Sequence, residues 1–222
     1  MRRAEVFIVN PQPLPFFAAL KCLNCPPLQQ ATVPGAEAVK TGHSTFLTGR
    51  FTFHMTLFFE EFKAQSVAYF EANTPRIQQC ISELSEAEVW QRPNGASNSV
   101  GNLVLHLCGN ITQYILSSLG GQPDHRARDA EFAATGGFTK QQLAEKLAAT
   151  AAEAARIMSQ ATETELLRSR SVQGFQLSGI GIMVHVTEHY SYHTGQIAFW
   201  TKQLKNKDLG FWSDKDLNAH NA

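Results

Sequence analysis

Helical spacing of the apolar residues runs through most of this sequence and restricts its fold more than any other feature. From Met55 onward, apolar residues recur every three or four positions, which is the period of a helix with one buried face. Helices are predicted at about 55–84, 97–119, 139–160 and 178–204. Pro75 interrupts the first, which we expect to be kinked or split. No convincing two-residue strand period is present, and irregular structure is expected between 160 and 178. The sequence therefore predicts an all-α four-helix bundle.

Polar residues at capping positions mark where three of these helices begin. Ser97 or Ser99 can cap the second helix through its hydroxyl oxygen. Thr139 with Gln142 three residues later forms a capping box for the third. Ser178 can open the last helix, so each long helical stretch after the first has a defined start.

Composition divides the chain into a bundle, an N-terminal extension and a short tail. Residues 1–54 hold six of the nine prolines and show no sustained helical or strand period. We expect this extension to be poorly structured, or not native if translation starts at Met55. A targeting peptide is the alternative, because two arginines precede an interrupted apolar stretch. The bundle is expected at 55–207, and a polar tail that frays at 208–222.

The charge balance narrows the kinds of partner. The chain of 222 residues has 19 basic and 19 acidic residues and a formal net charge of zero, so no overall field attracts nucleic acid or an anionic membrane. No apolar run approaches the roughly 20 residues that a membrane-spanning helix needs. Four cysteines in a chain of this length do not make a disulfide scaffold, so we expect a reducing cytoplasm. A small molecule or another protein is the expected partner.

Three histidines follow one another at four-residue spacing in the last predicted helix. His185, His189 and His193 are each turned by about 40° from the one before and lie about 6 Å further along the axis. Neighbouring imidazoles can therefore close on one metal ion. They share the inward stripe that also holds Ile182 and Ile197. The competing interpretation is that they are core histidines bonded to neighbouring side chains.

A second helix has to contribute to such a site. Three residues spread over about 12 Å of one axis cannot all reach an ion with bonds of about 2.0–2.1 Å. His106, on the inward face of the second helix, is the expected ligand from outside. Imidazoles suit zinc, nickel, copper or ferrous iron, and three of them leave a position open for water or substrate, as in catalytic sites. The sequence lacks both HExxH and the inward Glu-x-x-His pairs of dinuclear carboxylate sites.

Other polar residues near these positions have two interpretations each. Asn110, one turn after His106, can hydrogen-bond to a bound water or satisfy a buried polar contact. Arg126 and Arg128 lie in a charged loop that can cover the open end of the bundle and hold an anionic substrate. Alternatively they belong, with Glu131, to a solvated run of charges. No residue stands out as a catalytic acid or base.

Two segments together resemble the DinB-like (damage-inducible, YfiT-like) family of small four-helix metalloproteins. They are HLCGN, which begins at His106, and EHYSYHTGQI, which begins at Glu188. The resemblance covers roughly residues 55–205. The segments NTPRIQQCISEL and RARDAEF are similar to the branch of that superfamily whose members mostly lack an assigned activity.

The resemblance implies an up-down-down-up bundle that binds a divalent ion such as zinc or nickel, and often a homodimer. The matching ligands are His106, His189 and His193, with Gln196 close by and His185 beside the ligands or in a cavity. Some relatives act as thiol-dependent transferases or isomerases, in which the ion binds a low-molecular-weight thiol and lowers its pKa.

Three kinds of function remain open, the third of which is plain protein–protein scaffolding with an empty histidine cluster. The first is a metal-dependent enzyme of the thiol-dependent transferase or hydrolase type, acting on a small electrophilic substrate; the open three-histidine ligand set favours it. The second is a non-catalytic bundle that binds a metal or a stress ligand and acts through protein interaction. The lack of an evident general base favours that alternative.

Overall fold

The computed structural model describes residues 44–221, with side chains from Met55 onward. Contacts within the chain group its residues into two units, 1–42 and 43–222. Every helix and strand that the structure describes belongs to the second unit. The N-terminal extension predicted at 1–54 therefore lies mostly outside the described residues. Its last part is helical, because the first helix begins at Ser44, upstream of Met55.

Four long helical segments build this unit. They are α1 (Ser44–Glu71) followed by α2 (Asn73–Glu83), α4 (Val100–Ile111) followed by the π-helix η1 (Thr112–Leu119), α6 (Lys140–Gln160), and α8 (Gly179–Lys205). Short elements connect them: α3 (Glu86–Trp90), α5 (Arg128–Ala133), α7 (Glu163–Leu167), and the strands β1 (Ser169–Val172) and β2 (Phe175–Ser178).

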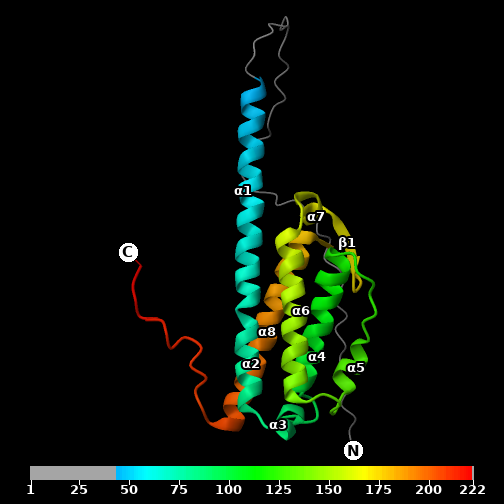
Figure 1. The fold of residues 1–222 in the computed structure, drawn as a ribbon, viewed down its shortest axis with the longest axis vertical. Helices are drawn as coiled ribbons and strands as arrows, with labels where there is room; N and C mark the ends of the chain where they lie inside the picture. Colours follow the sequence, from blue (N-terminus) through cyan, green and yellow to red (C-terminus); the bar gives the residue numbers. More distant parts are fainter. Residues whose placement is uncertain (1–43, 222) are drawn as a thin grey trace, which may run out of the picture. The chain divides into compact units, whose positions relative to one another are not determined.

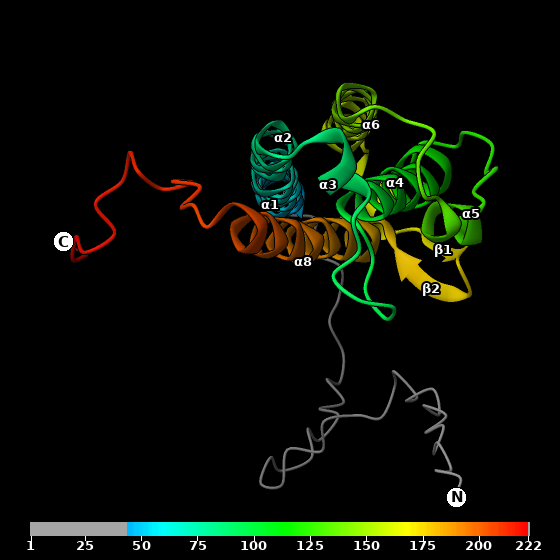
Figure 2. The same cartoon turned by 90° about the horizontal axis from the view of Figure 1, so that it is seen from below.

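The long segments form a bundle in which α4 and α6 run one way and α1, α2 and α8 run the other (Figure 1). α8 packs against α1, α2 and α4, and α6 packs against the same three helices. Figure 2 shows the bundle from its end, with α5 and the two strands outside α4. The predicted all-α, up-down-down-up four-helix bundle is confirmed. None of the described helices combines the length and the apolar character that crossing a membrane requires.

The helix starts follow the predicted capping chemistry. Ser99, rather than Ser97, caps α4. Thr139 caps α6 in a capping box with Gln142. Ser178 caps α8 by accepting a hydrogen bond from the backbone of the first turn. The first helix is split as expected, between α1 and α2. These hydrogen bonds satisfy backbone N–H groups that have no partner inside the helix.

The expectation of irregular structure between 160 and 178 is wrong. The helix α7 and an antiparallel hairpin occupy this segment, with Ser169 of β1 opposite Ser178 of β2. Gln173 and Gly174 form the turn, with φ angles of 51° and 83°. Positive φ at both central residues is what a tight hairpin turn needs. The strands have four residues each, too few for a two-residue period to be recognised.

α4 is enclosed on several sides. Eleven of its 12 residues are buried, because the helix contacts α6, α5 and α8. His106 is consequently only 5% exposed. Cys108 is buried too, and burial raises the pKa of its thiol to about 11, so it is a packing residue rather than a reactive one. A polar ring in such a setting needs partners, and these define the site described next.

Candidate metal centre

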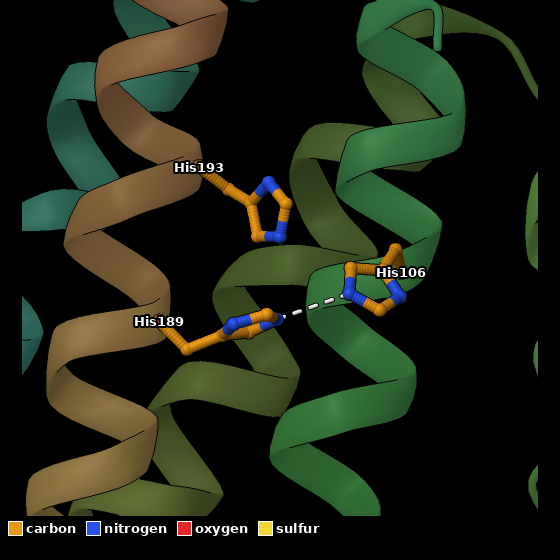
Figure 3. A group of neighbouring side chains, drawn as sticks. All are labelled: His106, His189 and His193. Carbon is orange, nitrogen blue, oxygen red and sulfur yellow. Dashed lines mark hydrogen bonds between the residues drawn. The ribbon is translucent and has the colours of Figure 1, made fainter. Parts of the chain in front are cut away.

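Three imidazoles meet between α4 and α8. His106 comes from α4, and His189 and His193 come from successive turns of α8 (Figure 3). One ring nitrogen from each lies within 4.8 Å of the other two. The Nε2 atoms of His106 and His189 are 3.0 Å apart. The structure thus brings together the three residues that the sequence singled out as ligands.

Hydrogen bonds on the far side of two rings set which nitrogen faces the centre. His106 Nδ1 lies 3.0 Å from Glu131 Oε2, and His193 Nδ1 lies 2.7 Å from Gln196 Oε1. When Nδ1–H donates to an oxygen, Nε2 is left with its lone pair, as a metal requires. These two rings are therefore oriented with Nε2 available toward the other histidines.

The environment keeps the α8 histidines neutral. Burial, and to a smaller extent the neighbouring His193 and His106, lowers the pKa of His189 to about 3. Burial also lowers the pKa of His193, against the opposing effect of its hydrogen bond to Gln196. Neutral imidazole is the form that binds a metal.

The spacing of the nitrogens fits a divalent ion. Bonds of about 2.0–2.1 Å in a tetrahedral site place ligand nitrogens about 3.3–3.4 Å apart. The Nε2 atoms of His106 and His189 are 3.0 Å apart. All three ligand nitrogens lie within 4.8 Å of one another. The expected spacing falls between these two distances. If both Nε2 atoms carry lone pairs, their contact is repulsive unless a cation or a proton lies between them. These three nitrogens could hold zinc or nickel after small side-chain adjustments.

A buried ion pair stands behind His106. Arg126 donates from Nε to Glu131 Oε1 at 2.8 Å and from Nη2 to Oε2 at 2.9 Å. Arg126 Nη2 is also 3.1 Å from His106 Nδ1, and Nη1 donates to Gln113 at 3.0 Å. Burial alone would raise the pKa of Glu131, but the hydrogen bonds from Arg126 and His106 hold it below its ordinary value. The carboxylate beside His106 is therefore charged.

Gly109 makes room for this carboxylate. A Cβ at position 109 would lie 1.9 Å from Glu131 Oε1, so no other residue fits without displacing Glu131. Asn102 fixes α5 from the same helix, since its Nδ2 donates to the carbonyl oxygens of Glu131 at 3.0 Å and Ala134 at 2.7 Å. α4 thus makes three contributions to the site. It carries the candidate ligand His106, Gly109 leaves space for the Glu131 carboxylate, and Asn102 anchors α5, which carries Glu131.

The other residues expected near the site lie at different distances from it. His185 stacks between Tyr114 and His189, with ring centroids 4.4 and 5.4 Å away. Its Nε2 is buried and has no hydrogen-bond partner among the described residues, and the same is true of Asn110 Oδ1. His185 therefore borders the histidine cluster, and Asn110 lies one turn after His106 on α4.

Arg128 does not reach the histidines. Its side chain is exposed, and its guanidinium carbon lies 4.8 Å from the ring centroid of Phe132, which in turn packs on His106 at 4.6 Å. Arg126 is the arginine of that segment that contacts the site. The interpretation of this stretch as a solvated run of charges is wrong for Arg126 and Glu131, whose side chains are 2% and 10% exposed.

Comparison with known proteins gives the family. Residues 58–213 match a family described as proteins of unknown function, DUF1572. The chain belongs to the DUF1572 family. No protein with a curated description is significantly similar to this DUF1572 chain in sequence.

Solved structures resemble this DUF1572 protein in fold. The DinB-like protein YjoA from Bacillus subtilis is 18% identical with a TM-score of 0.51, over 65% of this chain and 94% of its own. A conserved protein from Enterococcus faecalis is 18% identical with a TM-score of 0.56, over 65% and 97%. The expected DinB-like fold is thereby confirmed.

Proposed function

We propose that this DUF1572 protein binds a divalent ion, zinc or nickel, through His106, His189 and His193 and is a metal-dependent enzyme of the thiol-dependent transferase or hydrolase type. The observation that carries the proposal is the convergence of three ring nitrogens, two of them oriented by Glu131 and Gln196. Three ligands leave a position for a thiol or a water molecule. An ion in such a site would lower the pKa of the thiol or water molecule that it binds.

The charges around the cluster support an activating role. All three proposed ligands are imidazoles, which bind a metal in their neutral form, and the negative charge of Glu131 is paired with Arg126. The positive charge of an ion would therefore act on a bound thiol or water and on a small electrophilic substrate, rather than on a ligand carboxylate. A low-molecular-weight thiol is the proposed cosubstrate.

Metal content of the purified protein tests the site. We expect about one zinc or nickel per chain in the wild type and nearly complete loss in His106→Ala and His193→Ala, because two imidazoles bind too weakly to survive purification. His125→Ala is the matched control, since His125 is exposed and outside the cluster. Undiminished metal in both cluster variants would end the proposal.

A non-catalytic metal- or stress-ligand-binding bundle is the second candidate. It is favoured by the surroundings of the histidines, where the carboxylate of Glu131 is engaged by Arg126 and His106 and is not free to act as a base. Conjugation of a generic electrophile with bacillithiol, glutathione and mycothiol, with and without a chelator, separates the two. Chelator-sensitive turnover with any of the three supports the enzyme, and its absence with all three supports the binding protein.

We further propose that the protein acts in the cytoplasm as a homodimer. Tyr69 of α1 and Val184 of α8 are 70% and 53% exposed, and both line one groove between these helices. Apolar side chains gathered on one face mark an interaction surface more often than scattered ones do. The described cysteines Cys80 and Cys108 are free thiols, which agrees with a reducing compartment.

A further inference from the structure

His189 differs from the other two proposed ligands in how its ring is held. Nδ1 of His106 lies against Glu131, and Nδ1 of His193 lies against Gln196. Among the described residues, none hydrogen-bonds to His189 Nδ1, and the ring makes its one such contact through Nε2, toward His106. The torsion that turns an imidazole about its Cβ–Cγ bond has broad minima. Packing therefore has to fix the plane of this ring.

The flat face of His185 covers the ring of His189. The two residues are one turn apart on α8, and their rings stack with centroids 5.4 Å apart and planes inclined by 19°. His106 and His193 meet the same ring edge-on, at interplanar angles of 70° and 86°, and both are themselves proposed ligands. A ring that lies flat on its neighbour cannot turn about its Cβ–Cγ bond without a collision. His185 is therefore the neighbour outside the ligand set that resists rotation of His189.

Tyr114 covers the opposite side of His185. Its ring centroid lies 4.4 Å from that of His185, with the planes inclined by 30°, and its side chain is only 1% exposed. His185 Nε2 has no hydrogen-bond partner among the described residues. His185 thus contacts Tyr114 and His189 through the faces of its ring, as the middle member of a stack of three.

The hairpin holds the outer end of this stack. The hydroxyl group of Tyr114 donates to Gln173 Oε1 at 2.9 Å, which links η1 to the turn between β1 and β2. Gln173 has a φ of 51°, a left-handed conformation that hairpin turns usually give to Asn, Asp or Gly. The hydrogen bond provides a reason for glutamine at this position, because its longer side chain reaches the tyrosine. A π-helix and a residue of positive φ, both of which tend to occur at functional sites, therefore meet at one hydrogen bond.

Resting on the proposed metal site, we propose that His185 and Tyr114 are positioning residues that fix the ring plane of His189 and keep its Nε2 directed at the ion. Gln173 anchors Tyr114 from the hairpin. The competing explanation is core packing, in which an apolar side chain of similar volume would serve equally well. The two explanations differ in what position 185 requires, since positioning needs a flat ring whereas packing needs only volume.

Two variants of His185 separate these explanations. His185→Leu keeps an apolar volume and removes the ring, so we expect it to weaken zinc binding about tenfold, as loss of a residue behind a ligand typically does. His185→Phe keeps a flat ring and should weaken zinc binding less than about threefold. His125→Leu, in an exposed loop, is the matched control and should change nothing. Competition with a chromophoric chelator measures the affinities.

Stability distinguishes positioning from damage to the fold. Leucine replaces a buried ring nitrogen that lacks a partner, so metal-free His185→Leu should melt at least as high as the metal-free wild type. Wild-type zinc affinity in His185→Leu would overturn the proposal, and so would equal losses of affinity in His185→Leu and His185→Phe.

Two further variants test the anchor in the hairpin. Tyr114→Phe and Gln173→Gly remove the same hydrogen bond, so each should weaken zinc binding about threefold and the double variant no more than either one. Glycine suits the left-handed turn position, so Gln173→Gly should not lower the free energy of unfolding. Gln176→Ala, in an exposed residue of β2, is the control. Unchanged affinity in both single variants, or additive losses, would overturn the role of Gln173.

Carbon-13 relaxation of the imidazole Cε1–H groups separates this proposal from the metal site itself, because it reports ring motion in the metal-free protein. We expect the order parameter of His189 to match that of His106 in the wild type and in His185→Phe, and to fall in His185→Leu. If the wild type binds no metal, the proposed function fails while this measurement still tests the positioning. If metal binds and both the ring order and the zinc affinity are unaltered in His185→Leu, the positioning proposal alone fails.

Discussion

Glu131 is the residue through which α5 acts on the candidate metal centre. It accepts from His106 Nδ1, and a carboxylate in this position typically changes the affinity of a metal site by 10–100-fold without touching the ion. We expect Glu131→Gln to weaken zinc binding by about that factor, because the amide carries no charge and can turn its NH₂ toward the ring. Competition with a chromophoric chelator measures the affinity.

Two further measurements distinguish orientation of the ring from a general loss of structure. Asp129→Asn changes an exposed carboxylate in the same helix and should leave zinc affinity unchanged. Nitrogen-15 NMR of the metal-free protein should show His106 mainly protonated at Nδ1 in the wild type and a mixture of tautomers in Glu131→Gln. An unaltered tautomer together with unaltered affinity would refute this role of Glu131.

Gly109 allows a second test of the same contact from α4. Gly109→Ala places a Cβ 1.9 Å from Glu131 Oε1, so we expect Glu131 to be displaced, zinc affinity to fall and the free energy of unfolding to drop by about 1–3 kcal/mol. Gly195→Ala is the matched control in α8, where a Cβ meets open space. That change should stabilise the protein by about 0.5–1 kcal/mol. Thermal melts and zinc titrations of both variants decide the matter.

The residues of the site differ in how far sequence could predict them. Helical spacing fixes the separation and the face of His185, His189 and His193, and it places His106 on the inward face of the second helix. The choice of His189 and His193 over His185 came from the family resemblance. Glu131 and Arg126 reach His106 through a turn of the chain whose course no periodicity encodes. Their burial depends on Gly109 and Asn102, which act only in the folded protein.

The short elements were the hardest to predict. α5 has six residues and each strand of the hairpin has four, so neither holds enough periods to be recognised. The predicted second helix has the correct extent, but its end winds as the π-helix η1, in which Gly120 N–H donates to Ile115 C=O at 2.8 Å. η1 carries Tyr114 against His185. Such π segments often occur at functional sites.

The link between α3 and α8 predicts an acid-dependent part of stability. Glu88 closes the capping box of α3 with Ser85 and pairs with Lys205 Nζ at 2.6 Å. The hydrogen bond from Lys205, followed by those from Ser85, lowers the pKa of Glu88 to about 2. A carboxyl whose pKa is lower in the folded state contributes its stability above the unfolded value near 4.5 and loses it as pH falls toward 2.

We therefore expect Glu88→Gln to melt at a lower temperature than the wild type at neutral pH, with a difference that shrinks as pH falls from about 4.5 to about 2. Circular dichroism melts across this range measure it. Lys205→Met removes the other partner, and Glu88→Gln should then cost less in that background. A melting-temperature difference that stays constant with pH would contradict the assignment.

The whole bundle was the most predictable level. The sequence contains four long stretches with an apolar stripe at helical spacing, and such helices bury their stripes by packing into a bundle. Three of the four are preceded by caps, which the structure confirms at Ser99, Thr139 and Ser178. The order of the helices in space came from the family resemblance rather than from the spacing. The sequence did not predict where the first helix begins. It was expected from about residue 55, whereas α1 begins at Ser44.

The outer face of α1 and α8 is the interface that we expect for the proposed homodimer. Tyr69 and Val184 are largely exposed and line one groove between the two helices. If this face is the dimer interface, Tyr69→Glu combined with Val184→Glu should give a monomer by size-exclusion chromatography with light scattering, because each buried carboxylate lacks a partner. Leu167→Glu changes an equally exposed residue on α7 and should leave a dimer. A wild-type monomer, or a double variant that remains dimeric, would exclude this interface. If the double variant is monomeric while the wild type and Leu167→Glu remain dimeric, the two-fold axis lies beside the groove between α1 and α8.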